Sequence, residues 1–321
     1  MKILATACLL IATTGFAQAT PGKISLALVE HPGSLSIDQG NWKPTEYSAK
    51  PSGSEFGVRA EDGDLHLLAF LFLVPEMKTM TAASCRDGAL AAENDKALGP
   101  VGKLSMKSTS GVDIALALLI PKDGSYSALR AFVASGDLCG DILFSLHRPI
   151  DQQQLPQVTV KKMLMALQFD PSAKPTFNGA FAYATVEFDH QQYAGAAKAY
   201  RKALSLVVES DDPMKWTRVT TDQLSMSLGI SGDLKQSREV NEAAIKADPT
   251  YPLYYYNLAC ADGEEGKAAA ARTHLQQAFD RKANTLPGET LPDPATDDSF
   301  KKLISDPQFR AFVQTLSPSK P

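Results

Sequence analysis

A spacing of 34 residues constrains this chain more than any other feature of its sequence. Four pairs of matching residues lie 34 positions apart: Leu224 and Leu258, Gly232 and Gly266, Ser237 and Ala271, Ala244 and Ala278. An earlier copy, 41 residues ahead, places Ala196, Tyr200 and Ala203 at equivalent positions, so the segment 211–217 accounts for seven extra residues. Small residues recurring at helical spacing predict paired helices that each bury an apolar face on the next pair.

These copies resemble the tetratricopeptide repeat (TPR) family, whose pattern is Trp-x-x-Leu-Gly-x-x-Tyr, then Ala-x-x-x-Phe-x-x-Ala, then Pro. The residues that carry the resemblance are Ala184, Ala196, Tyr200 and Ala203, then Leu224, Leu228, Ser237, Ala244 and Pro249, then Tyr255, Leu258, Ala259, Ala271, Leu275 and Ala278. Two positions depart from the pattern, because Asp262 stands where an aromatic residue is usual and Asn241 replaces the Phe. The match spans roughly residues 177–284. A helical cap follows, with Phe300, Leu303 and Ile304 on one face, a break at Asp306-Pro307, and Phe309 and Phe312 beginning another helix.

The resemblance implies a concave face made by the first helix of each repeat, which binds a protein or peptide partner. Its expected contact residues are Phe181, Thr185, Phe188, Asp222, Met226, Tyr256 and Cys260. They include no cluster of Lys and Arg, so the clamp that grips two carboxylates in chaperone-binding members is not expected. A groove lined by aromatic residues and Met suits an apolar or extended peptide segment.

The first half of the chain, residues 20–168, has the periodicity of strands. Alternating or apolar runs cover residues 23–30, 55–62, 64–74, 112–120, 125–134 and 138–148, with turn signals at 62–64, 121–124 and 135–137. Residues 67–74 and 114–120 have the composition of central strands. Two helices are expected, one from Ser84 with a capping box to Asp87, the other around Val160, Met163, Leu164 and Leu167.

Together these elements predict an α+β domain, an antiparallel sheet with flanking helices. In outline it looks like the small sandwich domain of PsbP and Mog1-type proteins, on element order alone. Residues 169–176 are rich in Pro, Ser and Gly, which predicts a linker. Residues 177–321 then form the all-α, TPR-like domain with its C-terminal cap.

The first 19 residues have the pattern of a signal peptide. Lys2 precedes an apolar run to Ile11, and the small residues Ala17 and Ala19 precede Thr20-Pro21, which predicts cleavage after Ala19. We therefore expect a periplasmic or secreted protein. No later apolar run reaches the roughly 18 residues of a membrane span, so stable membrane insertion is not expected.

Export allows disulfides, and removal of the signal peptide leaves three cysteines. Cys85 and Cys139 both lie in the first half, whereas Cys260 occupies a small packing position in a repeat helix. We therefore predict a Cys85–Cys139 bond, with three buried thiols as the alternative.

No catalytic motif occurs in a suitable context. His190 is expected in a solvated turn between repeat helices, His66 in a strand, and residues 59–64 at a hairpin tip rather than in a calcium site. The formal charge of −4 gives no basic excess for nucleic acid. No metal or cofactor is expected.

The leading hypothesis is an exported, non-enzymatic adaptor or scaffold that binds proteins through its repeats. The alternatives are a cell-envelope enzyme with its site in the N-terminal domain, near His66 or His147, and a small-ligand or lipid carrier with a pocket at Leu68, Phe70 and Phe72.

Overall fold

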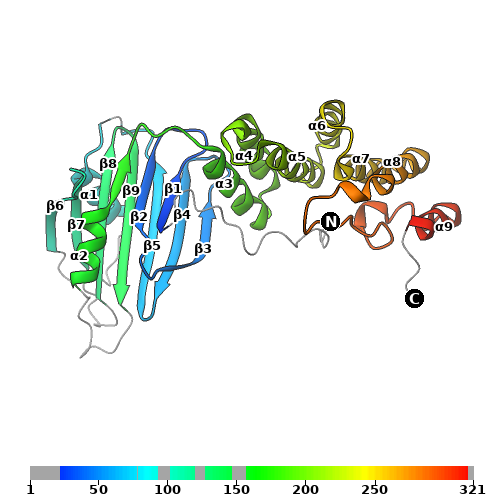
Figure 1. Cartoon of the computed structure of the whole chain (residues 1–321). Helices are drawn as coiled ribbons and strands as arrows, with labels where there is room; N and C mark the ends of the chain where they lie inside the picture. The colour runs from blue at the N-terminus through cyan, green and yellow to red at the C-terminus, as the bar shows by residue number, and fades with distance from the viewer. Residues whose placement is uncertain (1–21, 78, 93–101, 120–126, 147–156, 317–321) are drawn as a thin grey trace. The chain divides into compact units, whose positions relative to one another are not determined.

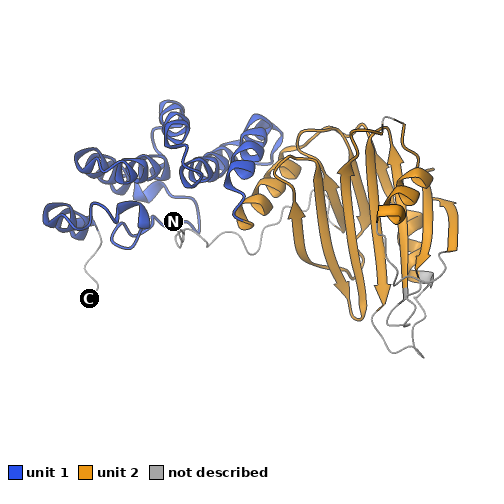
Figure 2. Cartoon of the chain, turned by 180° about the vertical axis from the view of Figure 1, so that it is seen from behind, with its two compact units in different colours: residues 1–17, 191–321 blue, residues 18–190 orange. Residues whose placement is uncertain are grey.

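The computed structural model describes residues 22–77, 79–92, 102–119, 127–146 and 157–316. They fall into two compact units that divide between His190 and Gln191 (Figure 2). The sheet-rich unit carries all the described strands and the helices α1 to α3, and the helical unit carries α4 to α9 (Figure 1). The predicted fold class, an α+β region followed by an all-helical TPR-like region, is confirmed.

The sheet-rich unit contains a seven-stranded antiparallel sheet of order β3-β4-β5-β9-β8-β7-β6. The strands are β3 (Lys43–Ala49), β4 (Glu55–Asp62), β5 (Leu65–Leu73), β6 (Gly102–Lys107), β7 (Asp113–Leu119), β8 (Ser127–Ser135) and β9 (Leu138–Leu146). The predicted strands β5 and β7 both lie inside this sheet. Gly63 and Gly136 adopt positive φ angles of 61° and 65° at two of the predicted turns, 62–64 and 135–137. The third predicted turn, 121–124, lies outside the described residues.

A second, three-stranded sheet of order β1-β2-β10 packs on one face of the large sheet. It consists of β1 (Lys23–Ala27), β2 (Ser34–Asp38) and β10 (Gln168–Asp170). The two sheets meet closely at Gly140, where an added Cβ would lie 3.2 Å from Leu35 of β2. Residues 169–176, expected to be a linker, therefore begin with residues of a strand.

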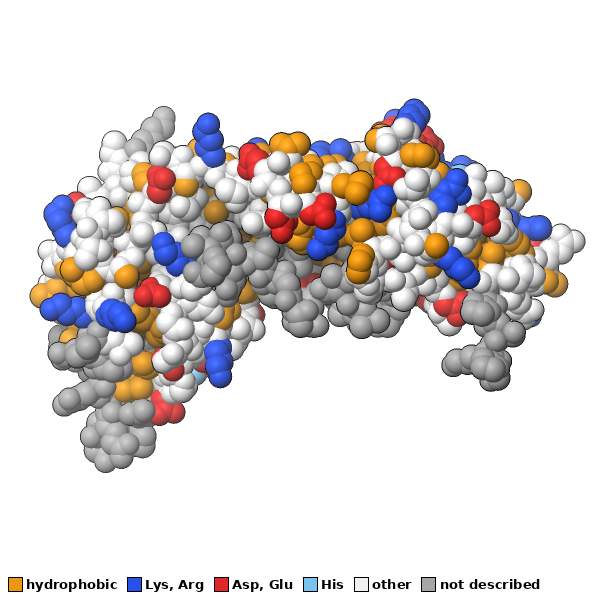
Figure 3. All heavy atoms as spheres, in the orientation of Figure 1, with side chains coloured by type: hydrophobic (Ala, Val, Ile, Leu, Met, Phe, Trp, Pro, Cys, Tyr) orange, Lys and Arg blue, Asp and Glu red, His pale blue; other side chains and the backbone are white. Residues whose placement is uncertain are grey.

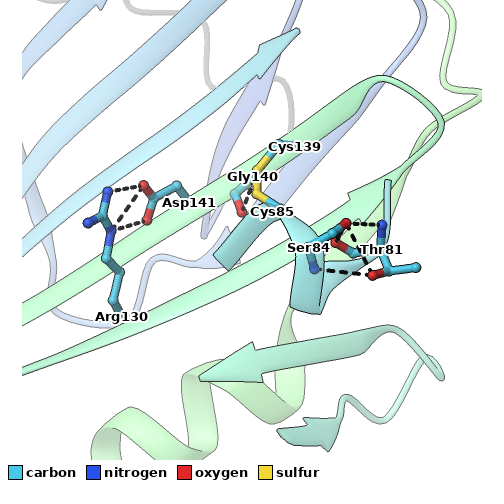
Figure 4. The surroundings of a disulfide bond; sticks show 7 residues. All are labelled: Thr81, Ser84, Cys85, Arg130, Cys139, Gly140 and Asp141. Atoms are coloured by element: carbon cyan, nitrogen blue, oxygen red, sulfur yellow. Dashed lines mark hydrogen bonds and ion pairs between the residues drawn. A yellow bond between two sulfur atoms is a disulfide. The ribbon is translucent and has the colours of Figure 1, made fainter. Parts of the chain in front are cut away.

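Helices cover both faces of the large sheet. Cys139 and Gly140 point to opposite faces because side chains alternate along a strand. The Cys139 face carries α1 (Ala82–Ala92), held by the predicted Cys85–Cys139 disulfide (Figure 4). The Gly140 face carries the small sheet and α2 (Gln157–Ala166), where the Trp42 indole N–H donates to the sulfur of Met163.

The structure moves the start of α1 from the predicted Ser84 to Ala82. Thr81 caps the helix, since its Oγ1 accepts from the backbone N–H of Ser84 while the Ser84 Oγ accepts from the backbone N–H of Thr81 (Figure 4). This reciprocal pair satisfies two backbone donors, so the capping box runs from Thr81 to Ser84 and does not involve Asp87.

The sheet-rich unit ends with α3 (Phe177–Asp189), which packs on β1 and β3. The Tyr183 ring lies 5.0 Å from that of Phe56, and its hydroxyl donates to the carbonyl oxygens of Lys50 and Glu55 at 2.6 and 3.0 Å. The predicted turn at His190 follows α3, and its side chain is exposed.

The helical unit consists of antiparallel helices in repeat register. They are α4 (Tyr193–Ser205), α5 (Pro213–Ile230), α6 (Leu234–Ala247), α7 (Pro252–Glu264), α8 (Ala268–Asp280) and α9 (Pro307–Leu316). With the 34-residue repeat, the start of α7 at Pro252 corresponds to position 218 in the preceding copy, but α5 already begins at Pro213. Most of the residues predicted as an insertion, 211–217, therefore extend the start of α5. The first helix expected in the cap is reduced to a short 3-10 helix, η4 (Asp298–Phe300). After the predicted break, the second cap helix, α9, begins at Pro307.

The turn inside each helix pair requires a left-handed backbone at the same repeat position. Gly232 and Gly266 have φ angles of 93° and 73° there, and Gln191 has a φ of 61° at the equivalent position of the first copy. Glycine enters this region without steric cost, whereas other residues pay about 1–2 kcal/mol. The predicted pairing of Gly232 with Gly266 thus has a backbone cause.

At the two positions that depart from the TPR pattern, the side chains belong to buried polar networks. Asp262 of α7, 1% exposed, accepts from Arg238 of α6 at 2.8 Å and from His274 of α8 at 2.6 Å. Burial alone raises the pKa of Asp262, but these two hydrogen bonds outweigh it and lower the pKa below its ordinary value. Asn241 donates to Ser225 and to the carbonyl of Ser237, so polar groups fill the space of the usual Phe.

Ala271 tests the register directly. It is fully buried in α8, within a cluster that includes Tyr254 and Leu275. We expect Ala271→Leu to overpack this cluster and lower the free energy of unfolding of the helical unit by about 1–3 kcal/mol. Denaturant unfolding followed by circular dichroism measures this. Ala269→Leu, at an exposed position of the same helix, is the control and should be nearly silent; equal effects of the two substitutions would contradict the register.

Candidate functional site

A cavity of about 270 Å³ lies in the helical unit, between α5, α7 and the segment 292–299. Figure 1 shows this segment, in orange, passing along α7. Nineteen residues line the cavity: Asp222, Ser225, Met226, Gly229, Ile230, Gly232, Leu234, Ser237, Leu253, Tyr256, Asn257, Cys260, Ala261, Glu264, Pro292, Thr296, Asp297, Asp298 and Ser299. Its volume lies just below the roughly 300–1,000 Å³ typical of sites for small molecules.

Four of the seven residues expected on the concave face line this cavity, namely Asp222, Met226, Tyr256 and Cys260. The repeat register places them there, because α5 and α7 are the first helices of adjacent repeats. The other three, Phe181, Thr185 and Phe188, lie on α3 in the sheet-rich unit.

Tyr256 is less accessible than a groove residue of an open repeat face. Only 2% of it is exposed, its ring packs edge-on against Phe300 at 6.0 Å, and its hydroxyl donates to Asp297 Oδ2 at 2.9 Å. The segment after α8 folds back over α7 and buries it. Tyr256 is therefore part of the core as well as of the cavity wall.

Asp222 is the buried carboxyl of the site. Its Oδ1 accepts from the side-chain amide of Asn257 at 2.8 Å, and only 7% of the residue is exposed. Burial raises the pKa of Asp222 to about 7; the Asn257 hydrogen bond partly offsets this shift, and the charge of Glu289 adds to it. This carboxyl therefore changes charge near neutral pH.

Gly263 allows the segment 292–299 to approach α7. A Cβ at this position would lie 2.4 Å from the carbonyl oxygen of Ser299 and 2.9 Å from Phe300 Cδ1. Only a residue without a side chain fits there, and it sits in the helix despite the roughly 1 kcal/mol by which Ala is favoured over Gly in helices. The missing side chain allows the segment 292–299, which forms one wall of the cavity, to lie close to α7.

We expect Gly263→Ala to push the segment away from α7. The clash is with backbone, so it should outweigh the gain in helix propensity and lower the free energy of unfolding by about 1–3 kcal/mol. Gly229→Ala in α5 is a matched control, because its Cβ would meet nothing nearer than Ser237 Oγ at 3.9 Å. Thermal unfolding of both variants distinguishes them: the control should gain stability. A stabilised Gly263→Ala protein would show that the segment does not pack here.

The described residues of the alternative hypotheses, His66, Leu68, Phe70 and Phe72, lie at alternate positions of β5, on one face of the large sheet. Phe72 packs against the core cluster that contains the disulfide, and Phe70 lies over Gly57, where a Cβ would be 2.4 Å from its ring. His66 of β5 lies 3.6 Å from Glu61 and is half exposed. His147 lies outside the described residues.

Charged side chains elsewhere form structural pairs. Asp141 of β9 and Arg130 of β8 make a bidentate, largely buried ion pair (Figure 4). On the face seen in Figure 3, acidic and basic side chains alternate over the helical unit without a block of one sign. Within the described ranges, no three His, Cys, Asp or Glu residues converge to hold a metal ion, and no helix is long and apolar enough to cross a membrane.

No family model and no curated protein sequence matches this chain. Solved structures do. The type III secretion chaperone SycD of Yersinia enterocolitica, crystallised with a peptide of the translocator YopD, is 14% identical over 43% of this chain and 88% of its own, with a TM-score of 0.30. The Sgt2 TPR domain of Aspergillus fumigatus is 15% identical over 45% and 87%, with a TM-score of 0.31.

A multi-domain immunophilin of Arabidopsis thaliana is 12% identical over 79% of this chain and 96% of its own, with a TM-score of 0.26. Scores of this size carry no argument about this chain. The repeat arrangement rests instead on its own helices, turns and register.

Proposed function

We propose that this protein is a non-enzymatic adaptor that binds a segment of a partner protein in the cavity between α5 and α7. The observation that carries the proposal is the cavity itself, because two adjacent first helices of the repeats and the segment 292–299 enclose it. Its apolar side chains, Met226, Ile230 and Leu253 among them, suit a peptide better than a fully hydrated ligand.

The proposal is tested by a photo-crosslinking residue placed at Met226 in the full chain, in its native cells. Met226 lines the cavity. We expect a discrete adduct with one partner protein, identified by mass. The same photo-crosslinking residue at Val208, which is 78% exposed and outside the cavity, is the control. The same adducts from both positions, or none from position 226, would contradict the proposed function.

We also propose that the protein acts outside the cytoplasm, on the basis of its first 19 residues. The intact mass of the protein recovered from the cell envelope or the medium should correspond to a chain that begins at Thr20. A protein that still carries residues 1–19 there would contradict cleavage after Ala19. The resemblance of the sheet-rich unit to PsbP and Mog1-type domains stays a prediction from element order.

A further inference from the structure

The cavity is lined by four carboxylates and by no Lys, Arg or His. Two of the four are neutralised by neighbours outside the cavity. Glu264 Oε2 lies 3.3 Å from Lys302 Nζ, and Asp298 Oδ1 lies 2.7 Å from Lys301 Nζ.

The other two, Asp222 and Asp297, make no ion pair with any described residue. They are held by neutral donors from consecutive residues of α7. Asn257 donates to Asp222 Oδ1 at 2.8 Å, and Tyr256 donates to Asp297 Oδ2 at 2.9 Å. The backbone N–H of Ser299 donates to Asp297 Oδ1 at 2.9 Å.

One carboxylate oxygen of Asp222, a residue that lines the cavity, accepts no hydrogen bond from the described residues. Asp222 is more than nine-tenths buried, and the described residues offer no hydrogen-bond donor to its Oδ2. A buried carboxylate that lacks a cation is costly, and a ligand that brings a positive charge removes that cost. The neutral donors fix where the carboxylates lie but leave their charge uncompensated.

The lining also includes apolar side chains, which suit the stem of a long cationic side chain. Met226, Ile230, Leu234 and Leu253 belong to it. Lys and Arg bury their methylene groups on such surfaces while the charged end reaches polar partners. The cavity thus offers both surfaces that these two side chains need.

We propose that the cavity binds a Lys or Arg side chain of the partner segment, with its charged end at Asp222 and Asp297. This inference rests on the proposed function and specifies its ligand. The charges are the reverse of those in a site where Lys and Arg side chains of the protein bind carboxylates of the partner.

The test is a library of immobilised 15-residue peptides with a fixed central residue, Lys, Arg, Gln, Leu or Glu, and randomised flanks. The full chain is applied, and retained protein is measured. We expect peptides centred on Lys or Arg to retain at least about tenfold more protein than those centred on Gln or Glu, since hydrogen bonds to charged groups contribute about 1.5–3 kcal/mol.

Two variants with equal charge changes locate the effect. Asp222→Asn with Asp297→Asn keeps an acceptor oxygen for the Asn257 amide and for the Ser299 N–H, and the Tyr256 hydroxyl can accept from the amide introduced at position 297. This double variant should abolish the preference for Lys and Arg. Glu264→Gln with Asp298→Asn removes the two carboxylates that already have Lys partners and should preserve it. If both double variants lose the preference alike, the effect is net charge, and the inference is overturned. Thermal melts confirm that each variant is folded.

The outcomes separate the inference from the proposed function. Retention by peptides regardless of the central charge, reduced by Met226→Ala, would leave the peptide-binding cavity in place and overturn its preference for cations. Retention by no peptide at all, at any salt concentration tested, would overturn both. Competition by free butylamine but not by Lys-centred peptides would show a small-amine site and would also overturn the inference.

Discussion

Asp222→Asn should raise the free energy of unfolding at pH 8 by about 3 kcal/mol and change it little at pH 4. Asp222 has an ordinary pKa of 3.8 in the unfolded chain and a pKa of about 7 when buried. Between these values the folded state binds the extra proton, so the unmodified protein loses stability as pH rises from about 4 through 7. Each unit of pKa difference corresponds to about 1.4 kcal/mol, which makes about 4 kcal/mol the upper limit.

The amide of Asn cannot ionise, so the variant should lack this part of the pH dependence. Its side-chain oxygen can still accept the hydrogen bond from Asn257. Urea unfolding at several pH values between 4 and 8 provides the comparison. The other ionisable side chains that interact with Asp222, those of Glu289, Tyr251 and Tyr254, are unchanged in the variant. A stability difference that stays constant from pH 4 to pH 8 would show that Asp222 is not the buried, protonated group.

Removing the disulfide should have an effect of similar size, confined to the sheet-rich unit. Cys85 and Cys139 are 54 residues apart in the sequence, and closing a loop of this length stabilises a protein by about 4 kcal/mol in the chain-entropy estimate. Both cysteines are buried, so Ala is the suitable replacement because it buries no new polar group. The double variant Cys85→Ala, Cys139→Ala should unfold at much lower denaturant concentration.

The two tryptophans allow each unit to be followed by itself. Trp42 is buried in the sheet-rich unit, and Trp216 lies on α5 of the helical unit. In single-tryptophan proteins, the fluorescence transition of Trp42 should shift and that of Trp216 should not. Cys260→Ala is the control and should leave the Trp42 transition in place. An unchanged Trp42 transition in the double variant would mean that the bond adds nothing to stability.

The repeats were predictable because their cause is local. Small residues such as Ala271 and Ala278 recur wherever helices touch, and the turn glycines recur wherever the backbone is left-handed. Strands with long runs of mostly apolar residues, β5 and β9 among them, were found because that pattern is also local. The disulfide followed from the positions of the cysteines in the two halves.

What the sequence did not reveal depends on contacts between distant segments. The short strands β2, β3, β6 and β10 have weak patterns, and their partners decide that they are strands. The segment 292–299 has no period, so its packing on α7 was missed, and with it the burial of Tyr256. One signal was present, since Gly263 sits in a helix where Ala would be favoured.

Asp222 and Asp297 show the same division within the site. The register placed Asp222 on the concave face, since it belongs to the first helix of a repeat. Asp297 lies in a segment outside the repeats, and only the fold brings it to the hydroxyl of Tyr256. The acidic character of the cavity comes from both residues. The repeat helices supply only part of it, so their residue types alone indicated an apolar groove.

The pairing of β2 with β10 has a consequence for synthesis on the ribosome. The strands β1 and β2 emerge early, but Ser36 of β2 pairs with Gln168 of β10, which follows all the other described strands in the sequence. Pairings this distant in sequence form slowly because the long intervening loop must close first. Until the codons for β10 have been translated, β2 in the nascent chain has an open edge, and such an edge is a template on which another strand can pair.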